Sequence, residues 1–147
     1  MSTSVTYPRA ADTPTSHLPF SPAVRVGDLV LVSGQASVDA TGKLVPDTFE
    51  GEFRRSIENM RLVLKAAGCD LKDVVQTRNY VRDPADVPRY NELYREYFSA
   101  PFPSRTTITN CLPPTLKYEV ECVAVAKGLR EATPRTNRSS LSQAAPP

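Results

Sequence analysis

The chain has 147 residues, of which 40% are hydrophobic and 23% are charged, and this length and composition are typical of one globular domain. Its net charge of +2 arises at the two ends, because the charges between Phe20 and Lys127 cancel, and a neutral domain argues against nucleic acid as a partner. No apolar run reaches the ~18 residues of a transmembrane helix. The first 20 residues also lack the apolar stretch of a secretory signal. We therefore expect no membrane partner and a cytoplasmic location, where the three Cys residues stay reduced.

Proline and polar residues gather at both ends of the chain and set the expected domain limits. Residues 129–147 are rich in Ser, Thr, Pro and Arg and hold few apolar side chains, so we expect a disordered tail. Residues 1–17, which contain Pro8 and Pro14, are expected to form a flexible N-terminal segment. The folded domain then spans residues 18–128.

Two strands and a long helix are predicted in the first half of this domain. Val24–Val26 and Leu29–Ser33 flank a Gly-Asp pair, which is a hairpin signal. Either Asp47 or Thr48 is placed to cap a helix. The apolar residues that follow recur every three or four positions, as one helix face requires: Phe49, Phe53, Ile57, Met60, Leu64 and Ala67. Gly68 stands where a helix-terminating glycine belongs.

The second half alternates the same two kinds of element. Residues Asp73–Arg82 are rich in Val, Thr and Tyr and predict a strand, and Asp86–Ala100 predicts a helix. Ser104–Cys111 and Lys117–Ala126 predict two closing strands. The order β-β-α-β-α-β-β indicates an α+β fold in which two helices cover one face of the sheet.

The opposite face of that sheet is expected to need a partner. Side chains alternate along a strand, and we expect this alternation to place Arg105 and Glu119 on the face without helices. Val123 and Val125 share the side of Glu119. A face that combines charged and apolar side chains suggests burial against another subunit.

Four segments, in this order and at these spacings, resemble the reactive-intermediate deaminase family, also called the YjgF/YER057c/UK114 family. They are SPAVRVGDLVLVSGQ (Ser21–Gln35), SIENMRLVLKAAGCDLKDVV (Ser56–Val75), YNELYREYFSAPFPSR (Tyr90–Arg105) and LPPTLKYEVECVAV (Leu112–Val125). The resemblance implies a chorismate-mutase-like fold and a homotrimer whose sheets form a central barrel, with a site at each subunit interface. It implies hydrolysis of enamine and imine acids such as 2-aminoacrylate to 2-keto acids and ammonia, without a cofactor. We also expect no metal site, because no His or CxxC pair completes a set of ligands around the Cys residues.

The resemblance also assigns roles to individual residues. Arg105 matches the arginine that binds the substrate carboxylate, and a planar guanidinium suits two-point carboxylate binding better than Lys. Glu119 matches the glutamate that holds the attacking water or moves its proton. Asn91 matches an asparagine of the site, and Gly34 matches a glycine whose backbone lines the pocket.

Four positions depart from the family pattern. Thr107 stands where many active members have a cysteine, and Phe20 stands where they have a tyrosine; both are expected to line the substrate site. Arg78 and Asn79 occupy a mid-strand position where a Thr and a branched apolar residue are expected. Arg78 is interpreted as a polar interface residue, or alternatively as a second cation for a larger or dicarboxylic substrate.

Two other functions remain open at this point. The first is a non-catalytic protein of the same fold that binds small carboxylates or acts as a regulator. The second, an endoribonuclease or translation inhibitor, is disfavoured because phosphate binding needs clustered Lys and Arg, which the neutral domain does not indicate.

Overall fold

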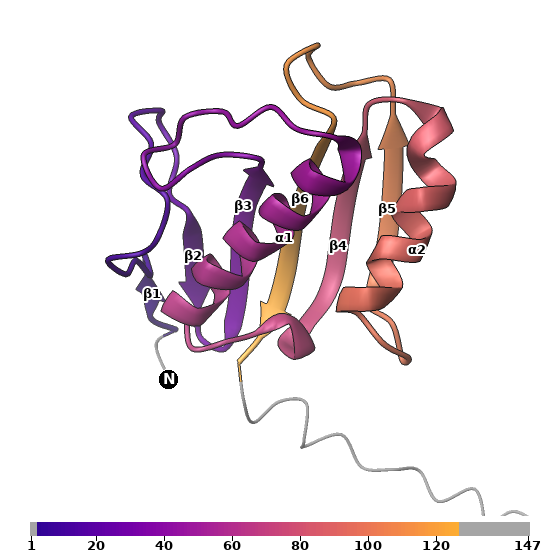
Figure 1. Cartoon of the computed structure of the whole chain (residues 1–147). Coiled ribbons are helices and arrows are strands. Elements are labelled where there is room, and N and C mark those ends of the chain that lie inside the picture. Colours follow the sequence, from indigo (N-terminus) through magenta and orange to yellow (C-terminus); the bar gives the residue numbers. More distant parts are fainter. Residues whose placement is uncertain (1–2, 127–147) are drawn as a thin grey trace, which may run out of the picture.

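A six-stranded sheet forms the centre of the structure, a computed structural model in which residues 3–126 are described (Figure 1). The predicted disordered tail, residues 129–147, lies outside these residues. The strands are β1 (Val5–Thr6), β2 (Ala23–Val26), β3 (Leu29–Ala36), β4 (Val74–Val81), β5 (Ser104–Thr109) and β6 (Tyr118–Val125). The helices are α1 (Phe49–Ala66) and α2 (Val87–Tyr97), with short 3-10 turns at Leu71–Asp73 and Pro84–Asp86.

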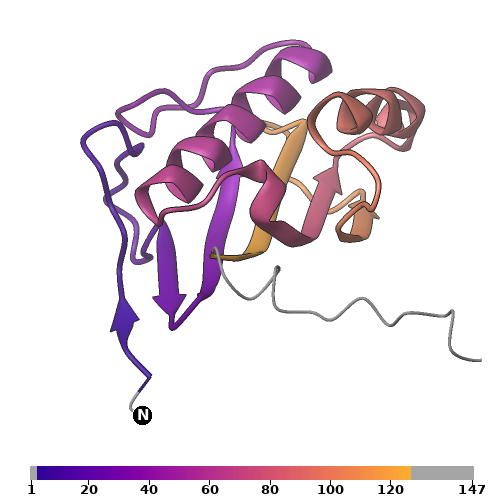
Figure 2. The ribbon, with the colours of Figure 1, turned by 90° about the horizontal axis from the view of Figure 1, so that it is seen from below.

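The strands are ordered β1-β2-β3-β6-β4-β5 across the sheet, so the last strand of the chain lies between β3 and β4. Every neighbouring pair is antiparallel except β4 and β5, which are parallel and are joined through α2. Figure 2 shows α1 and α2 on the same face of the sheet. The predicted α+β fold, with two helices over one face, is therefore confirmed.

Helix α1 begins and ends as its sequence predicts. Thr48, one of the two predicted caps, accepts a hydrogen bond from the backbone N–H of Gly51 at 3.1 Å. Gly68 follows the helix with φ +80°, a conformation that side-chain-bearing residues rarely adopt. The whole apolar stripe of the helix is buried against β3 and β6, which gives the domain its main core.

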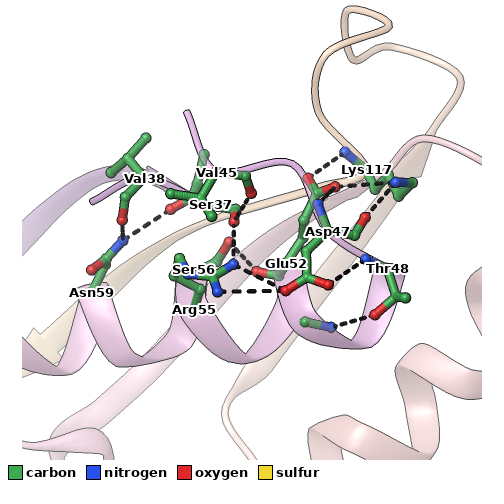
Figure 3. A network of polar contacts seen from close by, with 12 residues as sticks. Ser37, Val38, Val45, Asp47, Thr48, Glu52, Arg55, Ser56, Asn59 and Lys117 are labelled. Atoms are coloured by element: carbon green, nitrogen blue, oxygen red, sulfur yellow. Dashed lines mark hydrogen bonds and ion pairs between the residues drawn. The ribbon is translucent and has the colours of Figure 1, made fainter. Parts of the chain in front are cut away.

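A buried carboxylate ties the first turn of α1 to two loops (Figure 3). Glu52 is 1% exposed, and its Oε1 accepts from the backbone N–H of Lys117 at 3.0 Å. Its Oε2 accepts from the backbone N–H of Asp47 at 3.4 Å and lies 3.4 Å from the Lys117 ammonium. Lys117 belongs to the loop between β5 and β6, so Glu52 fixes the connection between two site-bearing strands.

Part of the segment predicted to be flexible joins the sheet. Val5 and Thr6 form strand β1, which pairs with the edge of β2. Further along, Thr13 is buried, and the backbone N–H of Thr15 donates to Ala40 O at 3.1 Å. The domain limits at residues 18 and 128 stay a prediction, but the sheet itself extends upstream of residue 18.

Helix α2 is shorter than the predicted span 86–100. Its last residue is Tyr97, and the backbone of Phe98 is already extended at φ −125° and ψ 140°. Pro101 and Pro103 follow, and neither supplies an N–H for a continuing helix. The segment after α2 instead turns back toward β5.

The sheet face opposite the helices carries exposed apolar side chains. Alternation along β6 buries Tyr118, Val120 and Cys122 under the helices, as predicted, and turns Val123 to the other face. The exposed large apolar residues of that face include Leu29, Leu31 and Ile108, each 41% exposed. In the described part of the chain, neither helix combines the length and apolar character needed to cross a membrane.

Candidate functional site

Arg105 lies on β5, at the edge of the sheet, and its side chain points toward helix α2. In the parallel register Arg105 stands opposite Thr77, which is fully buried on the helix-covered face. The prediction that Arg105 shares the helix-free face with Glu119 is therefore wrong. Alternation determines which residues of a strand share a side, but packing against α2 decides which side faces the helices.

Two tyrosine rings of α2 support the Arg105 guanidinium. Its Cζ lies 4.9 Å from the ring centroid of Tyr90 and 4.9 Å from that of Tyr94. Such contacts hold a cation by roughly 0.5–2 kcal/mol and favour a guanidinium plane over an ammonium point charge. Among residues 3–126, no carboxylate lies within 4.0 Å of Arg105. A carboxylate ligand would thus not have to displace a Glu or Asp side chain of this part of the chain from the Arg105 guanidinium.

A cavity of about 210 Å³ opens beside this guanidinium. It is lined by Asn91, Tyr94, Arg95, Phe102, Pro103 and Arg105. The loop that follows α2 supplies one wall, with Phe102 and Pro103, and α2 itself supplies the other. The structure thus brings two predicted site residues, Arg105 and Asn91, to one cavity.

Thr107 lies two residues beyond Arg105 on the same side of β5. Its hydroxyl is hydrogen-bonded to the hydroxyl of Tyr90 at 3.0 Å. Burial raises the pKa of Tyr90 to about 12, although the Thr107 hydrogen bond and the Arg105 charge oppose that shift. Tyr90 is therefore a neutral partner at physiological pH, and the Thr107 hydroxyl is engaged with it.

Glu119 and Gly34 form a second group on the other side of the sheet. A Cβ atom added to Gly34 would overlap Glu119 Oε1 and would lie 3.2 Å from Glu119 Cδ, so the carboxylate rests against a bare backbone. Burial, followed by the charge of Glu121, raises the pKa of Glu119. A carboxylate with a raised pKa is a stronger proton acceptor than an ordinary surface carboxylate, and enzymes shift general bases in this direction.

Phe20 lies close to this second group. It lines a cavity of about 310 Å³ together with Gly34 and several apolar residues, among them Leu18 and Leu44. The side chain of Phe20 is 48% exposed, and it offers the cavity an aromatic surface without a hydroxyl. Gly34 therefore lies against the Glu119 carboxylate and also lines this apolar cavity.

The predicted site residues thus fall into two groups within one chain. Arg105, Asn91 and Thr107 lie at the β5 edge under α2, whereas Glu119 and Gly34 lie around β3 and β6. Strands β3 and β5 are three strand steps apart, or about 14 Å. The two groups also face opposite sides of the sheet, so one copy of the chain does not bring them to one ligand.

Arg78 lies on the helix-free face, on the same side of β4 as Tyr80 and opposite Glu121 on β6. The hydroxyl of Tyr80 donates to Glu121 Oε1 at 2.5 Å, and this hydrogen bond, helped by burial, raises the pKa of Tyr80 to about 12. The β5 partner of Arg78 is Thr106, the residue next to Arg105, so the Arg78 and Arg105 side chains lie on opposite faces of the sheet. Among residues 3–126, Arg78 is not part of the lining of the Arg105 cavity.

Tyr90 and Tyr94 have a place in this site that was not predicted from their sequence pattern. Both are buried in the core, and their rings also support the Arg105 guanidinium. The sequence signal for this role was their spacing of four residues, which places both rings on one face of the helix that precedes the strand of Arg105. Among residues 3–126, no three His, Cys, Asp or Glu side chains lie close enough to hold a metal ion.

Comparisons with known proteins agree with this fold. The sequence model of the family described as Endoribonuclease L-PSP matches residues 10–126. Reactive Intermediate Deaminase A of Arabidopsis thaliana is 39% identical over 108 residues, which are 72% of this chain and 58% of that protein. The 2-iminobutanoate/2-iminopropanoate deaminase of Homo sapiens is 37% identical over 117 residues, covering 78% of this chain and 85% of the relative. The crystal structure of Escherichia coli TdcF with bound serine superposes with a TM-score of 0.73 at 29% identity, covering 82% of this chain and 98% of TdcF.

Proposed function

Because the chain belongs to the Endoribonuclease L-PSP family, which is the YjgF/RutC family of reactive-intermediate deaminases, we propose that it hydrolyses small 2-imino and 2-enamino acids. The products are a 2-keto acid and ammonia. The observation that carries this proposal is the Arg105 guanidinium, which lies against two tyrosine rings beside a cavity and has no carboxylate partner within the described part of the chain. The serine bound to the related TdcF is a small molecule with the same carboxylate group.

A second copy of the chain supplies the missing half of the site in this proposal. The helix-free face carries Leu29, Leu31 and Ile108, whose exposure a partner sheet would remove. A closed homotrimer in which these faces meet brings Glu119, Gly34 and Phe20 of one copy toward Arg105 of the next. The separation of the two groups within one chain supports a site built between copies.

The chemistry then needs few protein groups. The enamine tautomerises to an imine, water adds to the imine carbon, and ammonia leaves the tetrahedral intermediate as the C–N bond breaks. Arg105 binds the carboxylate through paired N–H donors and fixes the imine carbon in place. Glu119 holds the water and accepts its proton, a role that its raised pKa favours and that is typically worth about 10²–10⁴-fold in rate.

The residues that replace the usual cysteine and tyrosine fit this scheme without a covalent step. The hydroxyl of Thr107 is bound to Tyr90, so it orders the aromatic support of Arg105 rather than attacking the substrate. The backbone N–H groups near Thr107 remain available to the carboxylate. Phe20 keeps an aromatic wall but donates no hydrogen bond, which favours substrates with apolar side chains.

A coupled assay tests the proposal. An amino-acid oxidase generates imines from several amino acids, and the rate of ammonia release is measured with catalytic amounts of the protein. We expect acceleration by the wild type, loss of at least about 100-fold in Arg105→Ala, and retention in Arg89→Ala. Arg89 is the matched control, because it is an exposed arginine of α2 that pairs with Glu50 and Glu92 away from the cavity.

Two further measurements on the same variants, of 2-keto acid binding and of RNA cleavage, separate the two other functions. A non-catalytic carboxylate-binding protein would bind 2-keto acids in an Arg105-dependent manner without accelerating ammonia release. An RNA-directed activity would appear as cleavage of RNA that survives purification and disappears in Arg105→Ala. Equal rates for wild type, Arg105→Ala and buffer would overturn the deaminase proposal.

A further inference from the structure

A chain of buried polar groups lies directly behind the aromatic support of Arg105. At its centre is Asn79 of β4, which is 0% exposed. Its Oδ1 accepts from the hydroxyl of Tyr118 at 2.6 Å, and its Nδ2 donates to Thr77 Oγ1 at 3.0 Å. A weaker contact of 3.3 Å joins Nδ2 to the carbonyl of Thr106 on β5. The amide therefore links β4 with both of its neighbouring strands.

Each of the two stronger hydrogen bonds leads to one of the rings that carry Arg105. Thr77 Oγ1 is hydrogen-bonded to the hydroxyl of Tyr94 at 2.9 Å. The ring of Tyr118 packs against the ring of Tyr90, with centroids 6.0 Å apart. Asn79 thus reaches each ring through a single intermediate residue, and the two rings are the ones that flank the Arg105 guanidinium.

An asparagine is a costly choice at this position. Asn is disfavoured in strands, and a buried amide destabilises the fold unless its hydrogen bonds are satisfied. Here both of its polar ends have partners, and the Tyr118 hydroxyl, which is also buried, depends on Asn79 Oδ1. A satisfied buried network of this kind selects one arrangement of its members, which an apolar residue at 79 would not do.

We propose that Asn79 is a positioning residue that orients Tyr90 and Tyr94, and through them the Arg105 guanidinium, for carboxylate binding. This inference rests on the proposed function, because it assumes that Arg105 binds the substrate carboxylate. A two-point contact between planar groups is sensitive to orientation, and a displacement of ~1 Å can cost about 100-fold in rate. A substitution that lets the two tyrosine rings move, without removing them, should have a smaller effect, on the order of a 10-fold loss of affinity for the carboxylate.

A double-mutant cycle provides the test. The dissociation constant for pyruvate, a 2-keto acid probe, and kcat and KM for the imine are measured in Asn79→Leu, Arg105→Lys and the double variant. Asn79→Leu should raise the dissociation constant and KM on the order of 10-fold, with kcat changed about 3-fold or less. In the Arg105→Lys background, the same substitution should change the dissociation constant about 2-fold or less, because the two-point contact is already lost. The fall in thermal stability should be the same in both backgrounds.

A second variant covers the case in which Asn79→Leu does not fold. Thr77→Val is close in shape and removes only the link between Asn79 and Tyr94, and it should show the same dependence on Arg105. Equal loss of affinity in both backgrounds, or unchanged affinity in a folded variant, would overturn the inference. If wild type and Arg105→Ala differ as expected while the Asn79 and Thr77 variants match wild type, only the positioning role fails. If wild type itself neither binds pyruvate nor accelerates ammonia release, the proposed function fails instead.

Discussion

Replacing Glu52 by Gln tests the buried carboxylate that holds the start of α1. The substitution keeps the size and shape of the side chain but exchanges one accepting oxygen for an NH₂ group. Both oxygens of Glu52 face donors: the backbone N–H of Lys117 on one side, and the backbone N–H of Asp47 with the Lys117 ammonium on the other. A glutamine must therefore turn its NH₂ group toward one of these donors, whichever rotamer it takes.

The size of the effect follows from these contacts. A hydrogen bond to a charged group contributes about 1.5–3 kcal/mol, and a buried donor left without a partner costs about 1–3 kcal/mol. Loss of the ion pair with the partly exposed Lys117 adds little more, since solvent screens it. We expect Glu52→Gln to lower the free energy of unfolding by about 2–4 kcal/mol. At about 4 °C per kcal/mol for a domain of this length, Tm falls by about 8–16 °C.

Urea and thermal unfolding followed by circular dichroism measure this change, at one protein concentration so that assembly contributes equally. Glu58→Gln is the matched control, because Glu58 lies on the same helix and pairs with Arg61 at 3.1 Å, yet its side chain is 50% exposed. The control should change stability by about 0.5 kcal/mol or less. If Glu52→Gln loses no more stability than the control, the carboxylate does not hold the two loops and the reasoning is refuted.

Three further predictions concern the site. Glu119→Gln should slow ammonia release by about 10²–10⁴-fold while leaving stability at pH 7 equal or higher. Burial raises the pKa of Glu119, so this carboxyl lowers the stability of the folded state as the pH rises above its ordinary pKa, and the gain from Gln should vanish in acid below that value; a variant less stable at pH 7 would contradict this. Gly34→Ala should reduce kcat by about 10–100-fold, because the added methyl group displaces the Glu119 carboxylate. The free energy of unfolding should change by less than about 1 kcal/mol, since the methyl group meets this flexible side chain and no backbone atom. Unchanged turnover would count against Glu119 as the group that holds the water. Activity should return when Arg105→Ala and Glu119→Gln chains are mixed in equal amounts, unfolded together and refolded. Random mixing gives about a quarter of the sites an intact Arg105 from one copy and an intact Glu119 from another, so about a quarter of wild-type activity is expected. A mixture as inactive as the two variants alone would place both residues of a site in one copy.

Local sequence patterns were sufficient to predict most of the elements. The apolar spacing from Phe49 to Ala67 predicted α1, and the positions of Thr48 and Gly68 predicted its ends. These features depend on contacts within a few residues of the chain. The second helix was predicted too long, because Pro101 and Pro103 mark where a helix can no longer continue but do not show that the backbone is already extended at Phe98.

Features that depend on distant contacts were harder to predict. Alternation showed that Arg105 and Thr107 share a side, but only the packing of Tyr90 and Tyr94 on β5 decides that this side faces the helices. The polar residue at Asn79 was recognised as unusual, yet its partner Tyr118 lies 39 residues away on another strand. The family resemblance assigned the site residues together, and sequence alone did not reveal that one chain holds them in two separate groups.

The central place of β6 has a consequence for synthesis. Strand β6 is the last one in the described part of the chain, and it alone joins β3 to β4. Until it leaves the ribosome, the growing chain holds two unfinished sheets, each with an open edge that other chains could pair with. Helix α1 has by then been made, but the strand that would complete its packing surface has not. Completion of the sheet therefore waits for this final strand, and pairing over such long sequence separations favours slow folding.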